Sequence, residues 1–347
     1  MRYVGIDIGK WKCNAAVMDP EGVIVEEFAF ANDHAGLEEL ASRLTPEDRV
    51  VMESTGSVWS NLYNLLDEKH VPVVLANPLK TRAIASARIK TDKVDARILT
   101  HLLRSNLVAE CYVPPRSFRE LRALVRHRAS LVRVRTTVKN RVHALIDQRG
   151  IRCEYSDLFG KRGSEWLRKL DLGPLDGLML SNHLEHLESL NRQVDETDEM
   201  IRGRASVDED VRLLLSLTGV DVYTALLIRS EIGGISRFPD YKRLVSWAGL
   251  APSLHQSGSV EYSGRITKQG SKMLRWAMVE SARVAVRHDE RMRGFYERVK
   301  RRRGDGKAVV AVACKMLKII WFMLTRREAY QSRNEGRYGV KLKSLRT

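Results

Sequence analysis

Two hydrophobic periods alternate along the first hundred residues. Val4, Ile6 and Ile8 alternate with Gly5 and Asp7, which is the period-two pattern of a strand. Four further strands are predicted, and the last two alternate with helical stretches; they cover residues 13–18, 23–30, 49–53 and 72–76. Two short turns join the first three strands, so we expect an antiparallel meander that continues into strand–helix units. This order predicts a mixed α/β sheet flanked by helices.

The remainder of the chain follows the helical period. After Pro114-Pro115, residues 116–148 repeat apolar positions close to a heptad, and residues 184–201 repeat leucine, valine and isoleucine at similar spacing. We expect these two helices to form a helical hairpin or coiled coil. Residues 154–177 between them are glycine-rich and are predicted to be irregular.

The last third is predicted to be mainly helical around one long polar loop. Residues 213–231 fit a helix, a glycine turn and a second helix, and both a phosphate-binding helix-hairpin-helix and an ordinary helical hairpin remain open. Residues 253–270 are rich in serine and glycine, which predicts a loop that is either disordered or functional. Helices follow at 272–287 and 307–324.

Charge changes this picture by indicating a polyanionic partner. The chain carries 59 Lys and Arg against 43 Asp and Glu, a formal net charge of +16. Nucleic acid is the first candidate; an anionic membrane surface would need a lipid anchor or an amphipathic apolar face. The apolar run 308–324 contains Lys315 and Lys318 and is too short to span a bilayer, so we expect a buried helix and no membrane partner.

Cysteine usage and the amino terminus favour the cytoplasm. The four cysteines have no CxxC spacing, so they fit neither a zinc site nor a disulfide framework. Asp7 and Lys10 interrupt the start of the chain, and we therefore expect no signal peptide.

Four acidic residues of the first region are expected to lie together. Asp7 is in the first strand, Glu53 ends the fourth, and Asp92 and Asp95 share one face at the start of a helix. The element order is that of a ribonuclease H-like fold, in which the first and fourth strands are neighbours. Four adjacent carboxylates repel one another unless Mg²⁺ or Mn²⁺ lies between them. Two such ions, about 4 Å apart, can support phosphoryl transfer.

Each acid also has an ordinary structural explanation. Asp7 could be solvated on an edge strand, and Glu53 could be satisfied at a strand end. Asp92 and Asp95 could stabilise the positive end of a helix that Thr91 caps.

Several motifs resemble those of a known family of mobile-element enzymes. The segments are GIDIGK at 5–10, MESTG at 52–56, KTDKVDAR at 90–97, WAGLAP at 247–252 and QSG at 256–258. They resemble the DEDD transposases of bacterial insertion sequences, which are related to the pilin-gene invertase and guided by a bridge RNA.

The resemblance implies a division into domains and a role for each motif. It implies a RuvC-like catalytic domain at 1–112, a basic helix and coiled-coil arm at 113–205, a mainly α transposase domain with a serine loop at 206–330, and a basic tail at 331–347. By this resemblance Asp7, Glu53, Asp92 and Asp95 bind Mg²⁺. Ser257 is implied as the nucleophile that forms a covalent phosphoserine link to DNA, although composition alone does not separate it from Ser253, Ser259 and Ser263.

The resemblance also implies the partners: donor and target double-stranded DNA, a bridge RNA that pairs with both, and a homodimer that assembles into a tetramer. A nucleoid-associated location in a bacterial cytoplasm follows. Ten cations between residues 116 and 149 face only Glu120 and Asp147, so we expect this helix to repel itself without a polyanion. The predicted nucleic-acid contacts are Arg119, Arg122, Arg126, Arg133, Lys139, Arg141, Lys268, Arg298, Arg301 and Arg302.

Two other functions remain open at this point. A metal-dependent, structure-specific DNA endonuclease would use the four acids alone and leave Ser257 incidental. A non-catalytic nucleic-acid-binding protein would use the acids only for structure.

Overall fold

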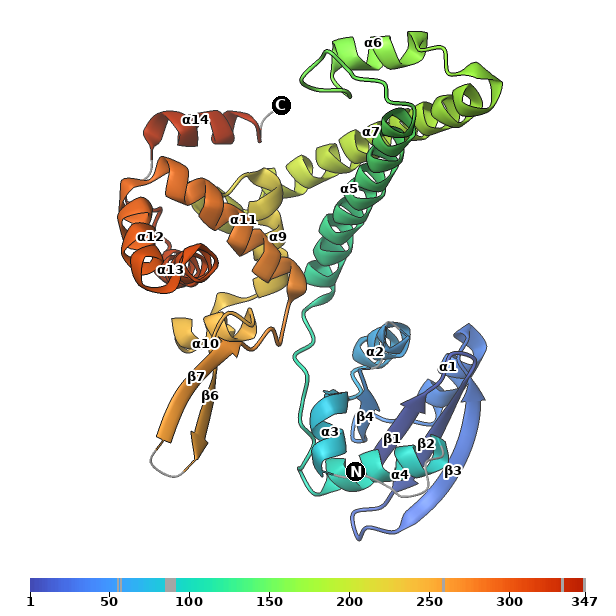
Figure 1. Cartoon of the computed structure of the whole chain (residues 1–347). Helices are drawn as coiled ribbons and strands as arrows, with labels where there is room; N and C mark the ends of the chain where they lie inside the picture. The colour runs from blue at the N-terminus through green and yellow to red at the C-terminus, as the bar shows by residue number, and fades with distance from the viewer. Residues whose placement is uncertain (55, 57, 85–91, 258–259, 332–333, 346–347) are drawn as a thin grey trace. The chain divides into compact units, whose positions relative to one another are not determined.

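The chain divides into two compact units, Met1–Val113 and Pro114–Thr347 (Figure 1). The structure is a computed structural model of residues 1–347. It describes all of them except residues 55, 57, 85–91, 258–259, 332–333 and 346–347, and it leaves out the side chains of 93 and 254–263.

The first unit is a five-stranded mixed sheet, which confirms the predicted α/β architecture. The strands are β1 (Tyr3–Ile8), β2 (Lys12–Met18), β3 (Ile24–Ala31), β4 (Arg49–Glu53) and β5 (Val73–Ala76). They lie in the order β3-β2-β1-β4-β5. β1, β2 and β3 pair antiparallel, whereas β4 is parallel to β1 and β5 is parallel to β4.

Helices cover both faces of this sheet. One face buries Val4, Ile6, Val50 and Met52 together with leucines of α1 (His34–Ser42) and α2 (Trp59–Glu68). The other face carries α4 (Asp92–Arg104), whose Leu99 and Leu103 pack on Val51 and Ala76. A further helix, α3 (Pro78–Ile84), follows β5. The alternation of the strands therefore sends one set of side chains into an apolar core and the other set, which includes Asp7, towards α4.

Two long helices begin the second unit. α5 (Arg116–Gln148) and α7 (Gly173–Ser206) pack against each other through leucine and valine side chains, which include Leu131, Val138, Leu187 and Val194. Val134 belongs to the predicted apolar seam but is exposed. The segment 154–177 is not wholly irregular, because it contains α6 (Lys161–Lys169), where Gly163 packs on backbone carbonyls.

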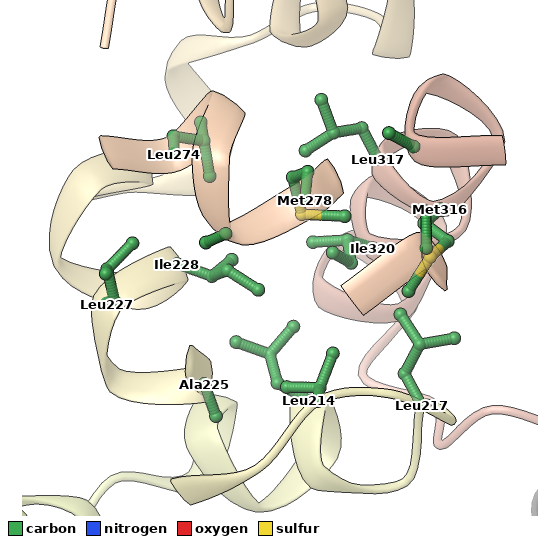
Figure 2. Packing of buried hydrophobic residues seen from close by; sticks show 14 of the residues in the cluster. Leu214, Leu217, Ala225, Leu227, Ile228, Leu274, Met278, Met316, Leu317 and Ile320 are labelled. Carbon is green, nitrogen blue, oxygen red and sulfur yellow. The ribbon is translucent and has the colours of Figure 1, made fainter. Parts of the chain in front are cut away.

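The rest of the second unit is a helical core around α13. Its elements are α8 (Glu209–Leu215), α9 (Val222–Ile232), η1 (Ile235–Arg237), α10 (Tyr241–Trp247), α11 (Lys272–His288), α12 (Glu290–Arg303), α13 (Asp305–Arg326) and α14 (Glu335–Lys343). Figure 2 shows Leu214, Ile228, Met278 and Ile320 meeting in this core. Within the described ranges, α13 alone is long and apolar enough to cross a membrane, and half of its apolar window is buried inside the fold. α14 forms in the segment that we predicted as a basic tail.

The prediction of a polar loop at 253–270 is largely wrong, because most of this segment is a β-hairpin. β6 (Pro252–Ser257) pairs antiparallel with β7 (Val260–Ile266), as the ribbon in Figure 1 shows. The serine and glycine content suggested a loop, but Val260, Tyr262 and Ile266 are residue types that favour strands. Two residues separate the strands, a length typical of tight hairpins.

Candidate active site

Neighbouring parallel strands bring the first two acids to one edge of the sheet. The last register pair of β1 and β4 joins Ile6 to Met52. Asp7 and Glu53 are the next residues along each strand. Residues that are level on adjacent strands share a face, so both carboxylates face the side that carries α4, at the carboxyl edge of the sheet.

α4 packs directly on β1 because Gly5 has no side chain. A Cβ at Gly5 would lie 2.2 Å from the carbonyl oxygen of Ala96. Thr100, which is buried, donates its hydroxyl to Ala96 O at 2.8 Å and lies 3.3 Å from Ala16 O of β2. This close approach fixes the helix over the strand that carries Asp7.

The direction of α4 brings the other two acids to the same edge. Arg104, in the last turn, donates hydrogen bonds to the carbonyls of Pro20 and Glu21 (3.0 and 3.1 Å). The β2–β3 turn to which they belong lies at the amino end of β1, so α4 runs antiparallel to β1. Its first turn, with Asp92 and Asp95, therefore lies at the carboxyl end of β1. Asp92 is exposed and Asp95 is half-buried.

The register of β1 and β2 adds two polar residues that the sequence analysis missed. Asn14 lies directly opposite Asp7, on the same face, and is only 7% exposed. Lys12 is two residues earlier on β2, so its side chain is on that face too, and it is exposed. The signal that could have found them is the pairing of the two strands across their short turn, which the sequence reading did not extend to individual residues.

The residue types at this edge fit a hard divalent cation. All four predicted ligands are carboxylates, the donors that Mg²⁺ and Mn²⁺ prefer. The side chains as described do not yet form a closed ligand set, because no three Asp, Glu, His or Cys residues within the described ranges lie close enough to hold an ion. The backbone thus brings the acids to one edge, but the described side chains do not group there as a ligand set.

A thiol near this edge is unsuited to nucleophilic attack. Cys13, on β2, is fully buried and lies in the core on the face opposite Asp7. Burial is the main reason that the pKa of its thiol is raised to about 11; a backbone hydrogen bond at Gly9 lowers this pKa, and the charge of Asp7 raises it slightly. At neutral pH Cys13 is therefore a protonated core residue.

The structure places Ser257 in the other compact unit, at the end of a strand. It is the last residue of β6 and pairs in register with Val260. Residues 258–259 and the side chain of Ser257 lie outside what the structure describes. The predicted nucleophile is thus next to the tip of a two-stranded ribbon.

Tight backbone packing fixes the base of this hairpin. Thr267 donates its N–H to Ala251 O at 2.9 Å, and Lys268 donates to Gly249 O at 3.1 Å. Gly270 has φ +107°, and a Cβ there would lie 1.9 Å from Trp247 O. Lys268, a predicted nucleic-acid contact, is exposed and left-handed (φ +55°) at this base.

Several cations of α5 bind carboxylates or backbone carbonyls of other helices. Arg126 donates two hydrogen bonds to one carboxylate oxygen of Glu231 (2.9 and 2.7 Å). Arg122 donates to the carbonyls of Ser230 and Glu231 (2.7 and 2.8 Å). Arg128 pairs with Asp198 of α7 (2.9 and 3.1 Å). The expectation that this helix needs a polyanion to offset its charge is therefore wrong in part, because α7 and α9 supply carboxylates.

Other predicted contacts remain on the surface. On α5, Arg133 and Arg141 are exposed, and on α12 so are Arg298, Arg301 and Arg302. Lys139 lies over the ring of Phe159, 4.7 Å from its centroid, and Arg119 donates to the carbonyl of Pro114 at 3.1 Å. These exposed arginines, of which Arg298 also lies 6.0 Å from the ring centroid of Phe295, are the part of the predicted interface that is accessible to a nucleic acid.

Comparison with known proteins identifies the family. A profile of transposases of the DEDD type matches residues 4–150, and a profile of the IS116/IS110/IS902 transposase family matches residues 211–297. The chain is 27% identical over 292 residues to the transposase for insertion sequence element IS1111A of Coxiella burnetii, covering 81% of this chain and 79% of that protein. It is 26% identical over 355 residues to the pilin gene-inverting protein of Moraxella bovis, covering 95% and 98%. The chain therefore belongs to the IS110/IS116 family of insertion-sequence transposases.

Proposed function

We propose that this transposase is a bridge-RNA-guided DNA recombinase that cuts and rejoins donor and target DNA through a covalent link to Ser257. Asp7, Glu53, Asp92 and Asp95 are the residues that would hold Mg²⁺. The observation that carries the proposal is the arrival of these four acids, from three separate segments, at one edge and one face of the sheet. The strand order β3-β2-β1-β4-β5 supports a ribonuclease H-like, RuvC-like domain.

The proposed chemistry exchanges one phosphate ester for another. The Ser257 hydroxyl loses its proton, its oxygen forms a bond to phosphorus, and the bond between phosphorus and one deoxyribose oxygen breaks. That deoxyribose oxygen takes up a proton and leaves as a free hydroxyl. Attack on the phosphoserine by another DNA hydroxyl then releases Ser257 and completes strand exchange without ATP, because each step makes one ester bond as it breaks another.

Each group of residues in this chain has a separate task. When bound at the acid edge, Mg²⁺ would supply charge stabilisation at the phosphate and lower the pKa of an attacking oxygen. The four carboxylates would hold it, and the rigid contact of α4 with β1 would keep Asp95 close to Asp7. A serine hydroxyl is a weak nucleophile by itself, so Ser257 would depend on acids that belong to the other unit, from the same chain or from another copy.

The partners follow from charge and from the resemblance. The exposed arginines of α5 and α12 would hold nucleic-acid backbones, while base pairing with the guide RNA would select the sequence. We propose a homodimer that assembles into a tetramer, with the α5–α7 pair as an assembly surface. The location would be the bacterial cytoplasm, in contact with the nucleoid.

A covalent-adduct assay tests this proposal. Full-length protein, co-expressed RNA, labelled donor DNA and Mg²⁺ are run on a denaturing gel beside Ser257→Ala and Asp95→Asn, with Ser253→Ala as the matched control from the same hairpin. We expect an adduct in the wild type and the control, and its loss in the other two variants. An adduct that persists in Ser257→Ala would exclude that serine. Cleaved DNA without an adduct would favour the metal-dependent endonuclease.

A further inference from the structure

We infer that Trp11 is a stacking platform for an unpaired base of the DNA strand that enters the acid edge. The turn between β1 and β2 contains Lys10 and Trp11, is followed by Lys12 at the start of β2, and directly follows the strand that carries Asp7. None of the motifs used above accounts for this tryptophan. The inference rests on the proposed function, since it gives the acid edge a second contact with its substrate.

The turn is held in place from both sides by one residue. Asn32, just beyond β3, donates its side-chain N–H to Gly9 O at 2.8 Å and its backbone N–H to Trp11 O at 2.9 Å. Lys12 pairs with Ala31 in the same ladder. A turn fixed by two such hydrogen bonds presents its side chains in a defined direction, which lowers the entropy lost when a ligand binds.

Exposure of the Trp11 ring has no structural explanation within its unit. Its side chain is 78% exposed, although tryptophan is among the residue types that gain most from burial. The ammonium group of Lys10 lies 4.9 Å from the ring centroid and leaves most of the ring open to solvent. The ring is therefore available to a flat partner from outside.

The charges of Lys10 and Lys12 favour a nucleic-acid strand over a protein as the partner of the ring. Lys10 and Lys12 are both exposed, and Lys12 lies on the Asp7 face of the sheet. The core of a protein–protein interface is depleted in lysine because burial of an ammonium group is costly, so an apolar protein surface is a poor match. A nucleic-acid strand offers both complements, a base for the indole and phosphates for the ammonium groups.

The position of the turn beside the acid edge favours the DNA strand that is cut as the ligand. Asp7 precedes Trp11 by four residues, and both lie at the carboxyl end of β1. A base that leaves the duplex beside the grouped carboxylates loses its stacking partners, and an aromatic ring next to them can replace those contacts. Base–aromatic stacking is worth about fivefold or more in affinity per base.

A binding assay that requires no catalysis tests the inference. The probe is a short fluorescein-labelled single-stranded DNA, titrated with the full-length protein in Ca²⁺ and followed by fluorescence anisotropy. We expect Trp11→Ala to weaken binding about fivefold or more and Trp11→Phe to stay within about twofold. Val25→Ala, an exposed apolar residue at the other end of β3, is the matched control and should bind like the wild type.

The outcomes separate this inference from the proposed function. Unchanged affinity in Trp11→Ala overturns the stacking site, even if Asp95→Asn still abolishes the adduct. Weaker binding in Trp11→Ala supports it, even if the adduct assay fails. A loss confined to single-stranded RNA, or a change of oligomeric state with normal DNA binding, overturns the inference in favour of an RNA or protein contact. A photocrosslink from 5-iodouracil DNA to the peptide that contains Trp11 would support it directly.

Discussion

The acid edge and the serine hairpin are built in opposite ways. The acids come from β1, β4 and α4, which are far apart in sequence and meet only because a sheet forms and a helix packs on it. Ser257 lies in one local ribbon whose two strands are separated by two residues. Long-range packing thus positions the residues proposed to hold metal, whereas a short hairpin on a fixed base presents the proposed nucleophile.

Removal of one acid should give the largest effect on activity. It should also abolish Mg²⁺ binding, whereas removal of Ser257 should not. We expect Asp7→Asn to reduce Mg²⁺-dependent DNA cleavage by about a thousandfold, because a ligand to the proposed ion loses its charge. Calorimetric titration with Mg²⁺ should show a heat of binding that Asp7→Asn loses and Ser257→Ala keeps. Glu21→Gln, an exposed acid in the β2–β3 turn, is the control. An unchanged Mg²⁺ heat in Asp7→Asn would contradict the assignment of the acid edge.

The stability of the second unit can be lowered by substitutions that leave the acid edge unchanged. Glu231 is 1% exposed, and Arg122 and Arg126 hold its carboxylate and carbonyl. Their joint replacement by alanine leaves a buried charge without its partners, so we expect the second unit to lose about 3–5 kcal/mol of stability. Amide hydrogen exchange, read separately for each unit, should show the loss in α5 and α9 and no change in β1.

The exposed arginines of the same helix provide the matched comparison. Arg133→Ala with Arg141→Ala should leave exchange rates unchanged but weaken DNA binding, with the salt dependence of log K reduced by about one per lost phosphate contact. If instead only the replacement of Arg122 and Arg126 altered the salt dependence, these two arginines would be the DNA contacts and their pairing with Glu231 would be secondary.

The same difference in construction explains what could be read from the sequence. The strands of the first unit were predictable because Val4, Ile6 and their counterparts alternate clearly, and the acids followed from strand order. Asn14 and Lys12 were not found, since their position beside Asp7 depends on a register that the pattern does not specify. The hairpin was predicted as a loop because its serines and glycines masked a weak alternation. The partners of Arg126 and Arg128 lie over 65 residues away in sequence, and no local pattern reveals them.

One glycine in the acid edge and one at the base of the serine hairpin allow a further test with a smaller expected effect. Gly5 lets α4 touch β1, and Gly270 lets the hairpin base touch Trp247 O. We expect Gly5→Ala to cost about 1–3 kcal/mol, to move α4 and to lower Mg²⁺ affinity. Gly270→Ala should cost a similar amount through its left-handed backbone and leave Mg²⁺ affinity unchanged. Thermal unfolding and Mg²⁺ calorimetry on both variants measure this; equal losses of Mg²⁺ affinity would show that the two regions are not independent.

The smallest expected effect concerns Asp48, at the end of the sheet opposite the acids. Its carboxylate has a structural role, which can be tested through the pH dependence of stability. Asp48 is 2% exposed and accepts hydrogen bonds from Arg2 (3.0 and 2.7 Å) and from the Thr45 N–H (2.9 Å). Burial by itself raises the pKa of Asp48, but these hydrogen bonds and the charge of Arg2 outweigh it and lower the pKa from 3.8 to about 2.

A lowered pKa stabilises the folded protein only while the carboxyl group is ionised. The contribution of Asp48 is therefore complete above about pH 4 and is lost as the pH falls towards 2. Because Arg2 is 37% exposed and water screens the pair, we expect a loss on the order of 1 kcal/mol. Asp48→Asn should show this loss already at pH 7, with little further change on acidification, whereas the exposed neighbour variant Glu47→Gln should follow the wild type. Urea unfolding of the full chain, read from hydrogen exchange in β1 and β4 between pH 2 and 7, measures the difference. If Asp48→Asn and the wild type instead kept parallel pH profiles, the carboxylate would be titrating as an ordinary surface group, and this end of the sheet would not depend on its charge.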